Sequence, residues 1–143
     1  HSLMYGGAKV GMHVTCACPA GYEPDPEVVA AARADGAATG AKMDIVRDPK
    51  EAVRGADILY TDVWASMGQE AEYEKRVRDF KGYQINAELV SMANPDCIVM
   101  HCLPAHRGDE ITEDAADGPH SVLWDEAENR LHVQKAILAL TMS

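Results

Sequence analysis

Two short apolar segments decide the predicted fold: DILYTDV at residues 57–63 and CIVMHC at residues 97–102. Each has the length of a strand, and each is apolar nearly throughout, as are strands that a parallel sheet buries on both faces. Helix-like stretches precede and follow both segments. We therefore predict that they are parallel strands inside an α/β domain.

The rest of the chain alternates strands with helices around these two segments. Asp25 followed by Pro26, and Asn86 before residue 87, are residue types that begin helices. The alternation predicts one domain over residues 1–143, a doubly wound (Rossmann-like) parallel sheet with helices on both faces. Further strands are expected at residues 12–17, 42–47 and 121–124, and helices at residues 2–10, 26–36, 49–55, 87–93 and 125–142, with a loop and a helix in the charged segment 66–81.

Composition excludes some classes of partner. The 143 residues carry 13 Lys and Arg against 23 Asp and Glu, a formal net charge of −10. Such an acidic chain repels a phosphate backbone, so we expect no nucleic-acid partner. No apolar stretch reaches the length of a membrane span, so no membrane partner is expected either. An anionic ligand would need positive charge placed locally, which directs attention to single arginines.

The cysteines indicate the compartment. Cys16, Cys18, Cys97 and Cys102 do not show the C-x-x-C spacing of zinc or redox sites. We expect reduced thiols in a cytosol-like interior.

Polar residues follow the two deciding strands, where ligands of open parallel sheets bind. The loop after the first strand brings Asp62 and the turn Ser66–Met67–Gly68. A carboxylate at a strand end can hold a substrate ammonium through a charge-assisted hydrogen bond. On position alone a helix cap or a solvated acid remains the alternative for Asp62, and an ordinary loop for the turn.

The loop after the second strand brings Cys102, which can be a reactive thiol or a buried core residue. We expect His101 and His106 to make structural hydrogen bonds, and we predict no metal site. Arg130 lies on the first turns of the last helix, among acidic neighbours that can pair with it, although arginine is also the side chain best suited to forked recognition of phosphate.

Three longer motifs carry a family resemblance. DVWASMGQ (residues 62–69), MHCLPAHRGDEI (residues 100–111) and WDEAENRLHVQKAIL (residues 124–138) resemble the ornithine carbamoyltransferases, in the right order over nearly the whole chain. The resemblance implies transfer of a carbamoyl group from carbamoyl phosphate to the δ-amine of ornithine, giving citrulline and phosphate, in arginine biosynthesis or the urea cycle. It implies no metal and no organic cofactor.

The resemblance also implies residue roles. Asp62 would bind the α-amino group of ornithine, with Ser66 and Met67 contributing from a mobile loop. Cys102 and Leu103 would line the junction between the two substrates, without Cys102 acting as a covalent nucleophile. Arg130 would bind carbamoyl phosphate and stabilise the charge that develops on the carbonyl oxygen. Cys102 and Arg130 are thus the expected catalytic residues.

Some family features are not in these 143 residues. The Ser-Thr-Arg-Thr and His-Pro-x-Gln segments of the carbamoyl phosphate domain are absent, as is the first strand of the ornithine domain with its asparagine. We therefore expect a partial ornithine-binding domain, inactive alone, from an enzyme that is typically a homotrimer. It would be cytoplasmic, or mitochondrial in an animal. The alternatives are an enzyme whose other half is a second chain, a transferase for an amine such as putrescine, and a noncatalytic α/β binding module.

Overall fold

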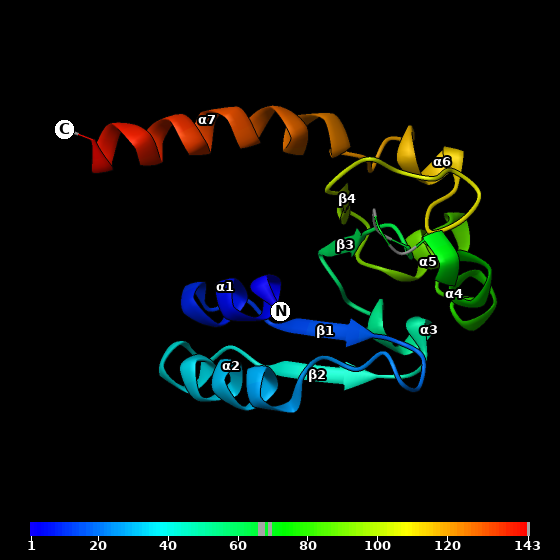
Figure 1. Ribbon diagram of the computed structural model, residues 1–143, viewed down its shortest axis with the longest axis horizontal. Helices are drawn as coiled ribbons and strands as arrows, with labels where there is room; N and C mark the ends of the chain where they lie inside the picture. Colours follow the sequence, from blue (N-terminus) through cyan, green and yellow to red (C-terminus); the bar gives the residue numbers. More distant parts are fainter. Residues whose placement is uncertain (66–67, 69, 143) are drawn as a thin grey trace. The chain divides into compact units, whose positions relative to one another are not determined.

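A computed structural model describes residues 1–65, 68 and 70–142. The chain divides into two compact units, His1–Ala52 and Val53–Ser143, each described here by itself. Each unit contains a pair of parallel strands with helices beside it (Figure 1). The predicted α/β class with parallel strands is confirmed.

The first unit runs α1 (Ser2–Val10), β1 (Val14–Ala17), α2 (Pro26–Thr39), β2 (Met43–Val46) and α3 (Pro49–Ala52). Strands β1 and β2 pair in parallel. Helix α2 begins as predicted, because the Asp25 side chain accepts a hydrogen bond from a backbone N–H of its first turn.

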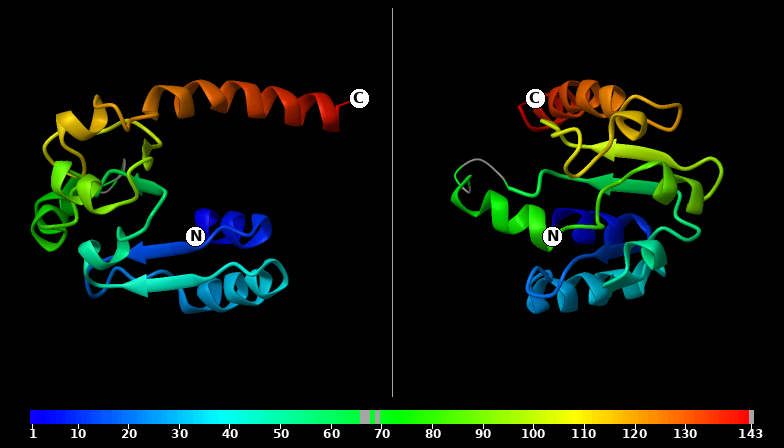
Figure 2. Two further views of the ribbon diagram at one scale, coloured as in Figure 1. Left: turned by 180° about the vertical axis from the view of Figure 1, so that it is seen from behind. Right: turned by 90° about the vertical axis from the view of Figure 1, so that its right-hand side faces the viewer.

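Glycines allow both long helices of the first unit to approach neighbouring parts of the chain closely. A Cβ atom added to Gly7 of α1 would lie 2.5 Å from Cγ2 of Val14, and one added to Gly36 of α2 would lie 2.8 Å from the backbone oxygen of Ala41. Helices α1 and α2 lie side by side in both turned views (Figure 2). The buried core of this unit is apolar: Met4, Ala8, Val29, Ala32, Ala41 and Met43.

The second unit is built on another parallel pair, in which β3 and β4 start in register at Ile58 and Ile98. Its core is again apolar and includes Val99, Ile111 and Leu123, which are almost fully buried. Its elements along the chain are β3 (Ile58–Thr61), the short 3₁₀ helix η1 (Glu70–Glu72), α4 (Tyr73–Asp79), α5 (Ala87–Met92), β4 (Ile98–His101), α6 (Glu113–Ala116) and α7 (Leu123–Thr141).

Strand β3 is less buried than its apolar sequence predicts. Leu59 is buried, but Ile58 and Tyr60 are about one third exposed, at 37% and 36%. In the described part of the chain β3 pairs only with β4, and its two faces are not both covered. Continuous apolar character therefore overstated the burial of this strand.

The segment at residues 121–124 differs from its prediction. Ser121 forms a single isolated bridge with Val99, and helix α7 starts at Leu123. The pairing ends there because Asp125 and Glu126, in the first turn, favour the helix at its N-terminus. Helix α6 lies in a segment for which only a loop was predicted.

Candidate active site

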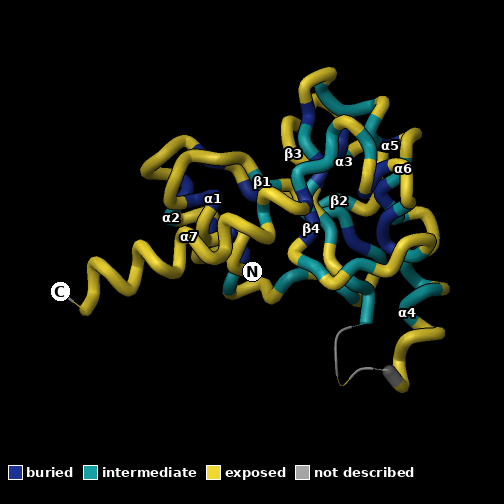
Figure 3. Tube along the Cα trace, turned by 90° about the horizontal axis from the view of Figure 1, so that it is seen from above, coloured by how far each residue is buried: buried dark blue, intermediate teal, exposed yellow. Residues whose placement is uncertain are grey.

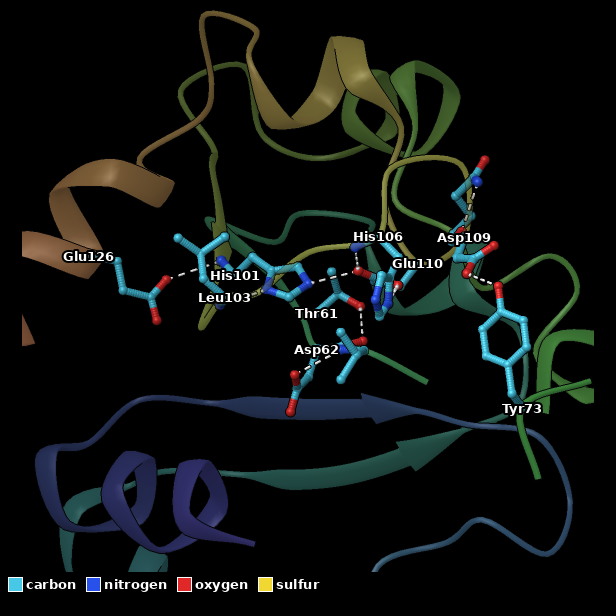
Figure 4. A network of polar contacts seen from close by, with 11 residues as sticks. Thr61, Asp62, Tyr73, His101, Leu103, His106, Asp109, Glu110 and Glu126 are labelled. Carbon is cyan, nitrogen blue, oxygen red and sulfur yellow. Dashed lines mark hydrogen bonds and ion pairs between the residues drawn. The ribbon is translucent and has the colours of Figure 1, made fainter. Parts of the chain in front are cut away.

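The carboxyl ends of β3 and β4 bring two of the predicted site residues together. Thr61 at the end of β3 lies in register with His101 at the end of β4, so that Asp62 and Cys102 leave the sheet side by side. Ligand atoms of Asp62, His101 and Cys102 lie within 4.8 Å of one another. Figure 4 shows Thr61, Asp62 and His101 converging at this edge.

The Cys102 thiol is held in its protonated form. Burial of the sulfur raises its pKa to about 11, together with the hydrogen bond to the Asp62 carboxylate and the negative charge of that group. A hydrogen bond with the Tyr60 hydroxyl acts in the opposite direction but is outweighed. Because the thiolate is the nucleophile, this exposed cysteine is a poor one at neutral pH.

His101 is fully buried and every polar atom of its ring is engaged. Its Nδ1 accepts a hydrogen bond from the backbone N–H of Leu103 at 2.9 Å, and its Nε2 faces Oε1 of Glu110 at 3.1 Å. Leu103 has a φ of +54°, the left-handed region that non-glycine residues rarely occupy. The ring of His101 therefore contacts the turn that carries Cys102 and Leu103.

Glu110 is the second fully buried polar residue of this unit. Burial by itself would raise the pKa of its carboxyl, but the hydrogen bond from His101 and those from the backbone N–H groups of His106 and Glu110 outweigh it, so the pKa is lowered. The N–H of His106 donates to Oε1 at 2.5 Å. Glu110 is thus a buried carboxylate in its charged form.

Helix α7 contacts the end of β4 through Glu126. One carboxylate oxygen of Glu126 accepts from the backbone N–H of His101 at 3.0 Å, and the other accepts from the Tyr60 hydroxyl at 3.1 Å. Arg130 lies one helical turn further along α7 and is exposed. Within the described residues no hydrogen bond or ion pair links Arg130 to Asp62 or Cys102.

The predicted site residues thus separate into three groups. Asp62, Cys102 and Leu103 lie at the strand ends, and Arg130 is placed by α7. Ser66 and Met67 lie outside the described residues. Sequence reasoning did not assign Glu110 or Glu126 to the site, although the i,i+4 spacing of Glu126 and Arg130 on one helix was a signal that could have linked them.

Two groups of described residues offer three metal-ligand atoms within 4.8 Å: Asp62, His101 and Cys102, and His106, Asp109 and Glu110. In the first group the thiol must lose its proton before a metal can bind, which its raised pKa opposes. In the second group the Tyr73 hydroxyl already donates to Asp109 at 2.5 Å. The absence of a metal stays a prediction.

Parallel strands with polar groups at their carboxyl ends define the general class, an α/β domain with a ligand site at one edge of its sheet. The sequence pattern of one family in this class, described as aspartate/ornithine carbamoyltransferase, Asp/Orn binding domain, matches residues 1–141. The chain belongs to the aspartate/ornithine carbamoyltransferase family.

Individual relatives agree with this assignment. An ornithine carbamoyltransferase from Symbiobacterium thermophilum is 59% identical over 143 residues, which are 100% of this chain and 46% of that relative. Solved structures of ornithine carbamoyltransferases from Pyrococcus furiosus and Gloeobacter violaceus match with TM-scores of 0.94 and 0.91 and 56% and 54% identity. They cover 99% and 100% of this chain, and the match spans 45% and 47% of theirs. The chain thus spans about half the length of its relatives.

Among the described residues, no helix is both long enough and apolar enough to cross a bilayer.

Proposed function

We propose that this chain is the ornithine-binding part of an ornithine carbamoyltransferase. The observation that carries the proposal is the juxtaposition of Asp62 and Cys102 at the ends of β3 and β4, in a chain whose relatives at 55–59% identity are named ornithine carbamoyltransferase. The reaction joins ornithine and carbamoyl phosphate to give citrulline and phosphate. One relative carries the further description "anabolic", which supports a role in arginine biosynthesis.

The proposed roles follow from the chemistry of the site. The carboxylate of Asp62 is exposed and suits the α-amino group of ornithine. Cys102, protonated and beside it, and Leu103 line the place where the neutral δ-amine attacks the carbonyl carbon. Charge that develops on the carbonyl oxygen and on the departing phosphate is stabilised by Arg130. No covalent step at Cys102 is needed, in agreement with its raised pKa.

A carbamoyl phosphate domain outside these 143 residues completes the proposed enzyme. Helix α7 supports this because it is exposed along most of its length (Figure 3). Its exposed apolar side chains are of a kind that another domain usually covers: Leu131, Val133, Ile137, Leu138 and Leu140. The same proposal includes assembly of the enzyme as a homotrimer. It places the enzyme in the cytoplasm or, for an animal protein, in the mitochondrial matrix.

Two other functions remain as outcomes of the test. Putrescine lacks the α-amino group that Asp62 would bind, so a putrescine transferase would leave this carboxylate without its role. A noncatalytic binding module would leave Cys102, Leu103 and Arg130 without a catalytic role.

The roles of Asp62 and Arg130 can be tested in a graft enzyme, in which this chain replaces the matching 143 residues of the Symbiobacterium relative. Asp62→Asn should raise KM for ornithine about 10- to 100-fold, the loss expected for a hydrogen bond to a charged group, and change KM for carbamoyl phosphate much less. Arg130→Ala should raise KM for carbamoyl phosphate and lower kcat about 100- to 1,000-fold. Initial rates of citrulline formation give both constants.

A matched control is Asp44→Asn, which removes an exposed carboxylate from β2 in the other unit. It should leave both KM values unchanged. Equal effects of Asp62→Asn on the two substrates would contradict the role of Asp62. If the graft binds putrescine in preference to ornithine, putrescine is the substrate and the proposed assignment of ornithine is wrong.

A further inference from the structure

A continuous line of hydrogen bonds runs from Glu110 through the ring of His101 to the backbone of Leu103 (Figure 4). His101 and Glu110 are both 0% exposed, so water cannot substitute for either partner. The line ends at the turn after β4, beside Cys102. It begins at Glu110, nine residues after His101, in the loop before α6.

The protonation state of His101 follows from this geometry. Nδ1 faces a backbone N–H, which is only a donor, so Nδ1 must carry a lone pair. Nε2 faces a carboxylate oxygen, which is only an acceptor when charged, so Nε2 must carry the hydrogen. A doubly protonated ring would place two donors against each other at 2.9 Å. The neutral Nε2–H tautomer is the one that satisfies both contacts.

Glu110 is in turn held in place by its own contacts. Its Oε1 accepts from the backbone N–H of His106 at 2.5 Å in addition to the His101 ring. Its Oε2 is buried without a hydrogen-bond partner and lies 4.0 Å from Nδ1 of His106. A buried carboxylate with one unpartnered oxygen is costly for stability, so its presence calls for an explanation.

We propose that Glu110 is a positioning residue for the active site: it fixes His101 in the Nε2–H tautomer, so that Nδ1 accepts from the Leu103 N–H and holds the Cys102–Leu103 turn in its left-handed conformation. The backbone of Leu103 at a φ of +54° is unfavourable in isolation. The hydrogen bond to His101 compensates for part of that cost. The carboxylate thus acts on the substrates through His101 and never touches them.

The tautomer can be measured on the 143-residue chain itself, independently of the proposed function. Nitrogen-15 NMR of the histidine rings at neutral pH should show His101 with a protonated Nε2 and an unprotonated Nδ1. Glu110→Ala should lower the share of this tautomer, because the Leu103 N–H is then the one contact of the two that still selects it. Glu110→Gln should largely retain it, since its amide oxygen can accept the same two hydrogen bonds. An Nδ1–H tautomer or a doubly protonated ring in the unsubstituted chain would overturn the proposal.

The control uses a second His–Glu pair of the same chain. His132 faces Glu128 at 3.2 Å across one turn of α7, but both side chains are largely exposed. Glu128→Gln should leave the His101 signals unchanged, because a solvated pair has no influence on the buried ring. A change of the His101 tautomer in that variant would show that the readout does not report on Glu110.

The kinetic part of the proposal rests on the proposed function and uses the graft enzyme. Glu110→Ala should lower kcat about 10- to 100-fold through displacement of the turn, as for other groups that orient catalytic ligands. KM for ornithine should change less than threefold, and Glu110→Gln should restore most of kcat. If kcat of folded Glu110→Ala is unchanged, positioning is refuted. If the unsubstituted graft is inactive, the proposed function fails while the NMR result still decides the tautomer.

Discussion

The side chain that most clearly links structure to chemistry is Cys102. It is exposed, which alone would favour reaction with alkylating reagents, yet its pKa of about 11 leaves it protonated. Burial of the sulfur is the largest cause of that shift, and Asp62 adds to it through its hydrogen bond and its negative charge. A positive ligand bound at Asp62 would therefore also lower the pKa of the Cys102 thiol.

This coupling predicts a measurable reactivity. At about pH 8 only roughly one thousandth of Cys102 should be thiolate, so alkylation by iodoacetamide should be slow. Asp62→Asn removes the negative charge, lowers the thiol pKa and should speed the reaction about three- to tenfold. Alkylation rates followed by peptide mass spectrometry give the result. Cys16 is the internal control. It lies in the other unit, His1–Ala52, and its pKa is raised to about 11 chiefly by its burial and by the neighbouring Cys18.

A rapid reaction of Cys102 in the unsubstituted chain would contradict the raised pKa. An unchanged rate in Asp62→Asn would mean that burial alone holds the thiol protonated.

Sequence reasoning identified Asp62 and Cys102, because the carboxyl ends of neighbouring parallel strands lie at one edge of a sheet. It did not identify Glu110 as buried. A glutamate in a loop is normally exposed. The burial of Glu110 depends on two partners nearby in the chain, the ring of His101 and the N–H of His106, which contact it when the loop folds back. Only the folded arrangement brings these together.

The secondary-structure elements were predicted best where local signals are strong. Four strands and the starts of α2 and α5 lie close to their predicted positions, and Asn86 caps α5 by accepting from the N–H of Leu89 at 3.1 Å. The strand expected at residues 121–124 is limited to a single bridge at Ser121, because Leu123 and Trp124 instead enter α7. Whether such a short segment forms a strand depends on the strand available to pair with it, and the local sequence pattern does not reveal that partner.

Helix α1 provides a matched pair of glycines for testing how it packs. Gly7→Ala places a Cβ 2.5 Å from Val14, so overpacking should lower the free energy of unfolding by about 1–3 kcal/mol. Gly6→Ala meets no atom within 4 Å and should raise it by up to about 1 kcal/mol, through higher helix propensity. Urea denaturation of the two variants measures both values. Equal changes would show that close approach to β1 does not constrain α1.

For the molecule as a whole, the sequence predicted the fold class and the family, and both are confirmed by the parallel strands and by the matched family pattern. The prediction of one domain was not tested, and the chain comprises two compact units. The relatives are about twice as long as this chain, and we propose that carbamoyl transfer requires the part that they have in addition.

Citrulline formation by the graft enzyme is the most direct test that this chain supplies the ornithine-binding part. The 143-residue chain alone should form no citrulline from ornithine and carbamoyl phosphate. The graft should form it at a rate that saturates with both substrates and falls sharply when putrescine replaces ornithine. A folded graft without turnover, beside an active unsubstituted Symbiobacterium enzyme, would contradict the proposal, as would turnover by the chain alone.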